Sequence, residues 1–130
     1  MIWLKTKKDN MATLTPTLTL VSTDTSTDSL SISVTDSLTV ATPMIDVARI
    51  TLTTGTTDLV GTGSSAIVYL YAKNTDSSQT VVLEQTADAK AFADLSPGEF
   101  CFFPVKGTKG VRAKSAASTA VLEYGYWTKG

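Results

Sequence analysis

The chain has 130 residues and a formal net charge of −1, and more than a quarter of its residues are serine or threonine. Histidine is absent and Cys101 is the single cysteine, which excludes a disulfide within the chain, the usual zinc sites and catalysis by a Ser/His/Asp or Cys/His relay. Basic residues are spread along the chain and no apolar run approaches about 18 residues, which argues against partnership with nucleic acid or a membrane.

The first ten residues differ in composition from the rest. An apolar start that contains Trp3 precedes a lysine cluster, and a second methionine follows at Met11. Either translation begins at Met11 and residues 1–10 are an upstream extension, or they form an arm whose Trp3 anchors on a neighbouring molecule. We therefore treat residues 1–10 as an extension or arm and residues 11–130 as a single domain.

Apolar and polar residues alternate with a period of two in the segments that follow. In residues 13–22 leucines alternate with threonines, and in residues 29–34 aliphatic residues alternate with serines. This alternation predicts strands with one face in water, and residues 46–54 and 80–85 continue the pattern. Pro16 lacks the N–H that a strand ladder needs, which indicates an edge position for the first strand.

Turn signals separate these segments at intervals of roughly ten residues. Pro97 and Gly98 suit a type II turn, because proline fixes φ at the second position and glycine accepts a positive φ at the third. The only helix candidate is the short segment 86–95. The sequence therefore predicts an all-β fold, a single-domain antiparallel β-sandwich of jelly-roll or Greek-key type with eight or nine short strands and little helix.

Three segments, residues 66–72, 99–105 and 120–127, are apolar on both sides, which places them between two packed layers. Either loops or the N-terminal arm cover the second side, or that side is an oligomer or docking surface. Aromatic residues are enriched at interface centres, so we favour the docking surface, although parity does not decide which side of each strand faces the core. The predicted interface residues are Trp3, Tyr69, Tyr71, Phe103, Tyr124, Tyr126 and Trp127.

No arrangement of residues indicates an active site. Cys101 lies in an apolar strand, an environment that makes a thiol inert. The glutamates Glu84, Glu99 and Glu123 occur singly, and most aspartates lie in turns, where their side chains bond the local backbone. The glycine-rich segment 61–66 is followed by a strand and predicts a loop, since a dinucleotide site requires a helix there. We predict no enzymatic activity, no catalytic residue, no cofactor and no metal site.

The C-terminal half resembles a group of small virion proteins of tailed bacteriophages. The resemblance rests on residues 69–84, 95–105 and 111–127, and above all on the aromatic PGEF hairpin at 97–100 and the Glu-Tyr-x-x-Trp ending at 123–127. Proteins of that group are single β-sandwich domains that decorate heads or serve as small tail components. The resemblance covers roughly the last 65 residues and does not extend to the first half.

The resemblance implies a non-enzymatic structural protein of the virion, a capsid decoration (cement) protein on the surface of the phage head. Its partners would be further copies of itself, as a homotrimer, and the shell of major capsid protein, with assembly in the host cytoplasm. Two alternatives stay open. One is a tail adaptor or fibre-base component, and the other is a carbohydrate-binding β-sandwich module whose exposed Tyr and Trp rings stack on sugars.

Overall fold

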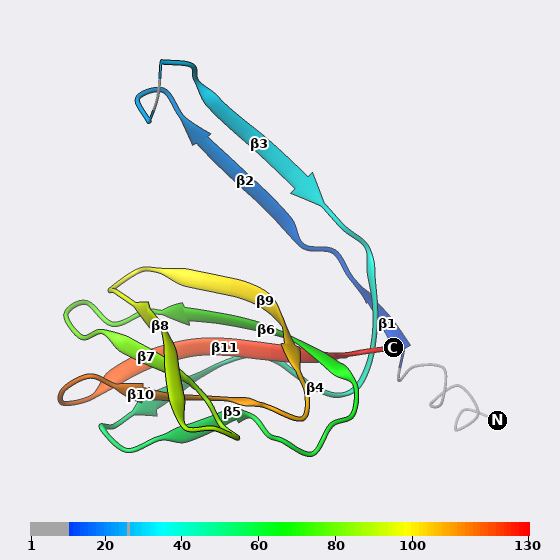
Figure 1. Cartoon of the computed structure of the whole chain (residues 1–130), viewed down its shortest axis with the longest axis vertical. Coiled ribbons are helices and arrows are strands. Elements are labelled where there is room, and N and C mark those ends of the chain that lie inside the picture. Colours follow the sequence, from blue (N-terminus) through cyan, green and yellow to red (C-terminus); the bar gives the residue numbers. More distant parts are fainter. Residues whose placement is uncertain (1–10, 26) are drawn as a thin grey trace. The chain divides into compact units, whose positions relative to one another are not determined.

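The computed structural model describes residues 11–25 and 27–130 (Figure 1). These residues form eleven strands in antiparallel sheets, and none of them is in a helix. The predicted all-β fold is therefore confirmed, with more strands than the eight or nine expected. Trp3 and the rest of the predicted N-terminal arm lie outside the described residues.

The chain divides into two compact units, whereas the sequence predicts a single domain from residue 11 onward. The first unit contains the described residues up to Ala41, together with Gly130, and the second is Thr42–Lys129. Residues 11–41 thus form a body of their own. The first unit holds β1 (Met11–Leu14), β2 (Thr17–Ser22), β3 (Leu30–Thr35) and the beginning of β4 (Leu38–Leu52).

In the first unit, β1 pairs with the beginning of β4, and β2 pairs with β3 as a separate two-stranded sheet. Pro16 separates β1 from β2, and its carbonyl oxygen accepts a hydrogen bond of 3.1 Å from the Asp36 amide. The predicted first strand is thus interrupted at Pro16, which lies in neither strand, and β1 stands at the end of its sheet.

The second unit contains eight strands in two sheets, the later part of β4 and the seven strands that follow it. One sheet has the order β4-β11-β6-β9, which β1 extends beyond β4, and the other has the order β5-β10-β7-β8. The seven strands after β4 are β5 (Thr57–Val60), β6 (Ile67–Asn74), β7 (Val81–Gln85), β8 (Lys90–Leu95), β9 (Phe100–Lys106), β10 (Val111–Ser115) and β11 (Ala120–Lys129).

This strand order is that of a jelly roll. The pairs β4 with β11, β5 with β10, β6 with β9 and β7 with β8 are the rungs of one long hairpin. Successive pairs belong alternately to the two sheets, as they do when such a hairpin is rolled into a barrel-like sandwich. The tertiary structure therefore selects the jelly roll from the two topologies that the sequence left open.

The tip of the long hairpin lies where the sequence suggested a helix, and that prediction is wrong. Residues 90–95 form β8, which pairs with β7 through Val81 opposite Leu95 and Leu83 opposite Ala93. Ala89, in the turn before β8, has a positive φ of 54°. Burial of Leu95 against the sandwich outweighs the weak helix preference of the alanine-rich segment, because propensity yields to tertiary packing.

All eight strands of the second unit contribute apolar side chains to one core. Leu52, Val81 and Leu83 are fully buried there, as the alternation predicts, whereas Ala48, which has the same parity as Leu52, is exposed. Each such side chain stabilises the fold by about 1.5–3 kcal/mol relative to an exposed one. The remaining core residues are Leu59, Val60, Val68, Leu70, Ala72, Leu95, Val105, Val111, Ala113, Ala120, Leu122 and Tyr124.

The turn between β8 and β9 has the predicted geometry. Gly98 has a positive φ of 86°, and the Glu99 amide donates to the Ser96 carbonyl oxygen at 2.9 Å, as in a type II turn with Pro97 at its second position. The Gly98 amide in turn donates to the backbone oxygen of Asn74 at 2.9 Å. The turn is thereby attached to the end of β6.

Asn74 holds three segments of the jelly roll together from a buried position. Its side-chain Nδ2 donates to the carbonyl oxygens of Gln79, at 2.7 Å, and Leu95, at 2.9 Å. Its Oδ1 accepts from the Asp76 amide at 2.9 Å. Asp76 Oδ2 then accepts from the amides of Ser78 and Gln79, so this turn aspartate bonds the local backbone, as predicted.

Candidate interaction surface

The three strands predicted to be apolar on both sides lie next to one another, in the order β11-β6-β9. Their register aligns Tyr71 with Phe102 and Gly125, and Tyr69 with Pro104 and Trp127. Because side chains alternate along a strand, each of the three strands presents one set of residues to the core and the other set to the opposite face of the sheet. We call this opposite side the outer face.

Three of the predicted interface residues lie on the inner face. Tyr124 is buried in the core, and Phe103 and Tyr126 are partly buried against it. Phe103 also meets Phe92 of β8 edge to face, with ring centroids 5.9 Å apart. These three residues therefore contribute chiefly to the stability of the chain itself, and they offer a partner little surface.

The other three described interface residues, Tyr69, Tyr71 and Trp127, lie on the outer face. Tyr69 is buried there because Phe102 stacks on it, with centroids 6.2 Å apart and planes 14° from parallel. Trp127 lies over Gly125: a β-carbon at Gly125 would come within 3.0 Å of Trp127 Cη2. Trp127 Nε1 donates to Asp46 Oδ1 at 3.3 Å, which fixes the ring along the sheet.

The most exposed apolar residues of the outer face were not among the predicted ones. Phe100 is 62% exposed and Phe102 is 37% exposed, and Ile67 is exposed further along the same face, opposite Lys106. On β9 the residue predicted at the interface is Phe103 instead. The sequence does indicate which side of β9 faces solvent. Lys106 has the same parity as Phe100 and Phe102, and a lysine usually lies on the solvent side of a strand. We call Ile67, Tyr71, Phe100, Phe102 and Trp127 the aromatic face.

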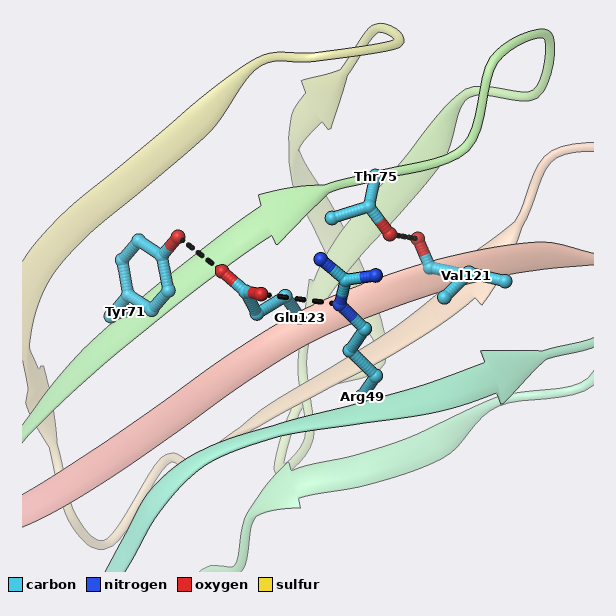
Figure 2. A network of polar contacts seen from close by, with 5 residues as sticks. All are labelled: Arg49, Tyr71, Thr75, Val121 and Glu123. Atoms are coloured by element: carbon cyan, nitrogen blue, oxygen red, sulfur yellow. Dashed lines mark hydrogen bonds and ion pairs between the residues drawn. The ribbon is translucent and has the colours of Figure 1, made fainter.

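A polar network borders the aromatic face (Figure 2). Glu123 accepts a hydrogen bond from the Tyr71 hydroxyl at 2.9 Å and one from Arg49 Nε at 3.2 Å. These two bonds hold the pKa of Glu123 below its ordinary value. Burial, followed by the Glu123 bond, raises the pKa of Tyr71. The only carboxylate in this network is therefore already paired, and its charge does not oppose burial of the neighbouring rings.

Figure 2 also shows a second contact on this side of the sheet. Thr75 Oγ1 donates to the carbonyl oxygen of Val121 at 2.9 Å, and the Thr75 amide donates to the same oxygen at 3.0 Å. Together the two bonds tie the end of β6 to the start of β11. The arrangement keeps the strands that carry the aromatic face in a fixed register.

A second ion cluster lies on the other sheet of the jelly roll. Glu84 of β7 is buried and binds Arg112, with Nη2 to Oε1 at 2.8 Å, and Lys114, with Nζ to Oε2 at 3.1 Å. The hydrogen bond from Lys114, and next that from Arg112, lower the pKa of Glu84. Both carboxylate oxygens are occupied by cations of the same chain. The cluster is arranged to join β7 to β10, and neither oxygen is free to act on a ligand.

Cys101 faces the interior of the sandwich, partly buried against the core. Burial raises the pKa of its thiol to about 11, and a backbone hydrogen bond with Ala72 opposes this shift. At neutral pH the thiolate, which is the reactive form, is nearly absent. Cys101 is therefore a packing residue of the inner face.

The first unit carries a second exposed apolar surface. The register of β2 and β3 places Leu18 opposite Val34 and Leu20 opposite Ile32, with Leu30 on the same side. We call these five residues the aliphatic face; each is between 36% and 54% exposed. The opposite side of the hairpin carries hydroxyl residues and Val21. There the hydroxyl oxygens of Thr17 and Thr35 are hydrogen-bonded at 3.0 Å.

Comparisons with known proteins do not assign the chain to a family. No family model matches the chain, and a search of curated proteins finds no match. In the described part of the chain no helix is long and apolar enough to cross a membrane. Over the same residues, no group of three or more Cys, Asp or Glu side chains is placed to hold a metal ion.

Proposed function

We propose that the chain is a non-enzymatic structural protein of a tailed-phage virion, a capsid decoration protein that binds the head shell as a homotrimer. The observation that carries the proposal is the aromatic face. Phe100, Phe102 and Ile67 stay exposed on a jelly roll whose core is otherwise complete. Contiguous exposed apolar residues that include aromatic rings mark surfaces that bind other proteins.

The free energy of binding through the aromatic face would come mainly from the burial of its apolar side chains. Burying the aromatic face against a shell would gain about 25 cal/mol per Å² of apolar area, before the costs of association. Tyr69 supports Phe102 from below, and Glu123 is neutralised by its own neighbours, so docking would leave no carboxylate of this network unpaired. Stacked rings beside a paired carboxylate suit repeated binding to a symmetric shell.

The jelly-roll fold is compatible with a structural role in the virion, but the fold alone does not distinguish that role from others. Jelly rolls occur among viral capsid proteins, and they also occur among lectins and enzymes. The resemblance of residues 69–127 to small virion proteins supports the virion over the other settings. The chain would then be located on the head surface, after assembly in the host cytoplasm.

Co-sedimentation with purified shells tests the proposal. Exchanging Phe100 and Phe102 for serine should weaken shell binding by about tenfold or more, because aromatic anchors carry most of the binding energy at an interface. Phe92→Ser is the matched control, since Phe92 is 51% exposed but belongs to β8 in the other sheet. Failure of the unaltered protein to sediment with shells, or equal losses in both variants, would contradict the proposal.

A position in the tail would use the same surface on a different partner. Imaging of labelled particles distinguishes the two positions directly. Mass spectrometry of purified particles provides a second measure, because hundreds of copies per particle indicate the shell. A few copies per particle would move the protein to the tail and would contradict the decoration role.

A carbohydrate-binding module is the second candidate, and one observation favours it. An open depression beside Phe100 is lined by Asp94 and Glu99, so an exposed ring lies next to polar groups that could bond sugar hydroxyls. Glu99 Oε1 already accepts a bond from the Ser96 amide, which leaves Asp94 as the freer of the two. Binding to a glycan array that Phe100→Ala abolishes would favour this candidate over the virion role.

A further inference from the structure

We propose that the aromatic face binds an acidic protein surface, in which an apolar centre lies between two groups of carboxylates. The proposal deepens the proposed function, on whose docking face it rests, by naming the chemistry of the partner. Three lysines on the same side of the sheet as the exposed rings lead to it: Lys73, Lys106 and Lys129.

Two of the lysines mark opposite ends of the aromatic face. The register places Lys73 of β6 opposite Phe100 of β9, and it places Ile67 opposite Lys106 at the other end. Odd-numbered residues of β6 and even-numbered residues of β9 lie on the outer face, so both pairs belong to it. Six residues of extended strand separate Phe100 from Lys106, which is about 20 Å. The apolar part of the face therefore has a lysine at each end.

The third lysine adds to the charge at the Ile67 end. Lys129 is the last residue of β11, and it has the parity of Trp127, which lies on the outer face. Lys129 follows Thr128, which pairs with Val68, so the register brings it beside Ile67. The Ile67 end of the face thus carries two lysines, one on each strand that neighbours β6.

These lysines have no carboxylate partner of their own. In residues 11–25 and 27–130, the ion pairs of the structure are formed by other cations. Lys73 is opposite Glu123 across the ladder, but the bonds to Glu123 come from Tyr71 and Arg49. The other two lysines are exposed to solvent. All three ammonium groups can therefore pair with the carboxylates of a partner.

The face is positive although the chain is not. Arg49 and Asp46 reach it from β4, through their bonds to Glu123 and Trp127. With them, the described residues of the face carry four cations and two carboxylates, whereas the whole chain has a formal net charge of −1. Such a local excess of one sign attracts a surface of the opposite sign and speeds the encounter with it.

The same charges disfavour a second copy as the cover of this face. Because both ends carry lysine, a second aromatic face would bring lysines against lysines in either orientation. Like charges that face each other across an interface are costly. The copies of a homotrimer should therefore associate through other surfaces and leave the aromatic face to a different protein.

Nucleic acid fits the arrangement less well. A DNA strand carries a phosphate about every 3.4 Å, and its binding needs cations along the whole path of the backbone. Here about 20 Å of mostly apolar surface separates the two cationic ends. A protein surface with an apolar centre matches that spacing, because its carboxylates can lie at the rim, where they keep part of their hydration.

Charge reversal compares two lysines on different sheets. Lys106→Glu and Lys90→Glu change the net charge equally, but Lys90 begins β8 in the other sheet. At about 0.1 M salt, where charges act over about 10 Å, Lys106→Glu should slow association with immobilised shells by about fivefold or more. Lys90→Glu should slow it by about twofold or less. Equal slowing by both variants would overturn the proposal.

Binding of synthetic peptides tests the face without shells. One peptide has six apolar residues between glutamates, and its counterpart has lysines in place of the glutamates. Amide signals of the isotope-labelled protein, followed by nuclear magnetic resonance, report which strands each peptide contacts. The acidic peptide should shift signals of β6, β9 and β11 at about tenfold lower concentration than the basic one. A single-stranded oligonucleotide is the third probe.

The outcomes separate the partner chemistry from the decoration role. If the protein does not bind shells but the acidic peptide shifts β6, β9 and β11, the decoration role fails and the partner chemistry stands. If shells bind the Lys106→Glu variant at the unaltered rate, the decoration role stands and this proposal fails. It also fails if the basic peptide or the oligonucleotide binds as tightly as the acidic peptide. Shifts of the same signals on concentrating the protein alone would identify a second copy as the cover, against the proposal.

Discussion

The β2–β3 hairpin and the jelly roll are built from the same alternation of apolar and polar residues, yet only the jelly roll encloses its apolar side. Leu83 of β7 and Leu20 of β2 both occupy apolar positions of alternating strands, but Leu83 is fully buried and Leu20 is 45% exposed. The comparison teaches that alternation defines an apolar face and leaves open whether the same chain supplies its cover.

The largest expected effect contrasts these two leucines directly. Leu83→Ala should lower the free energy of unfolding by about 2–5 kcal/mol, because it leaves a cavity among core side chains that cannot collapse fully. Leu20→Ala should change it by about 0.5 kcal/mol or less, because the Leu20 side chain is already 45% exposed. Urea denaturation of both variants measures the difference. Equal losses would mean that the hairpin is packed within the single chain.

The second prediction contrasts a buried polar group with an exposed one. Asn74→Ala should cost about 1–3 kcal/mol, since it leaves the carbonyl oxygens of Gln79 and Leu95 without their donor. Thr17→Ala removes an exposed hydroxyl pair of the hairpin and should cost about 0.5 kcal/mol or less. Thermal and urea unfolding curves provide the measurement. If Thr17→Ala lowered the free energy of unfolding as much as Asn74→Ala does, the predicted difference between the buried and the exposed polar group would be wrong.

The third prediction concerns a turn of the jelly roll. Gly98→Ala should cost about 1–2 kcal/mol, because a β-carbon is disfavoured at a φ of 86° even though nothing lies nearby to clash with it. Gly63→Ala is the control: its surroundings are equally open, its φ is not positive, and the change should be neutral or stabilise by about 0.5 kcal/mol. Calorimetric unfolding midpoints compare the pair. A neutral Gly98→Ala would argue against the turn geometry.

The smallest effect at neutral pH concerns the Glu84 cluster. The pKa of Glu84 is lowered in the folded chain, so its ionised form contributes stability above the ordinary glutamate pKa, and this contribution is lost as pH falls through the folded pKa. The urea midpoint of the unaltered protein should therefore fall more steeply between about pH 6 and pH 3 than that of Glu84→Gln. Thr19→Ala, in a hairpin strand without ionisable side chains, should leave the acid dependence unchanged.

Much of the fold could be predicted from short segments. Leu52, Val81 and Leu83 are inward as their parity indicated, and Pro97 and Gly98 form the expected turn. These features depend on sterics within a few residues. The segment 86–95 was predicted wrongly because its alanines suit a helix, and only pairing with β7, which requires the whole sandwich, makes it a strand.

The candidate surface was only partly predictable. The sequence indicated that β6, β9 and β11 are apolar on both sides, and it could not assign each side to the core or to water. Phe102 and Phe103 are neighbours of equal hydrophobicity, and the choice between them depends on which one the opposite sheet can cover. The lysine at 106 was a local signal for the correct choice, whereas the stacking of Phe102 on Tyr69 was not readable from either residue.

The sequence by itself determined the all-β class, the apolar and polar sides of the hairpin strands, and the inert setting of Cys101, because these follow from a period of two and from residue chemistry. The tertiary structure decided the jelly-roll order, the division of the chain at residues 41 and 42, and the exposure of Phe100 and Phe102. The physical reason is the range of the interactions. Alternation is set by the backbone geometry of one strand, whereas strand order and burial are set by which distant segments together exclude the most water.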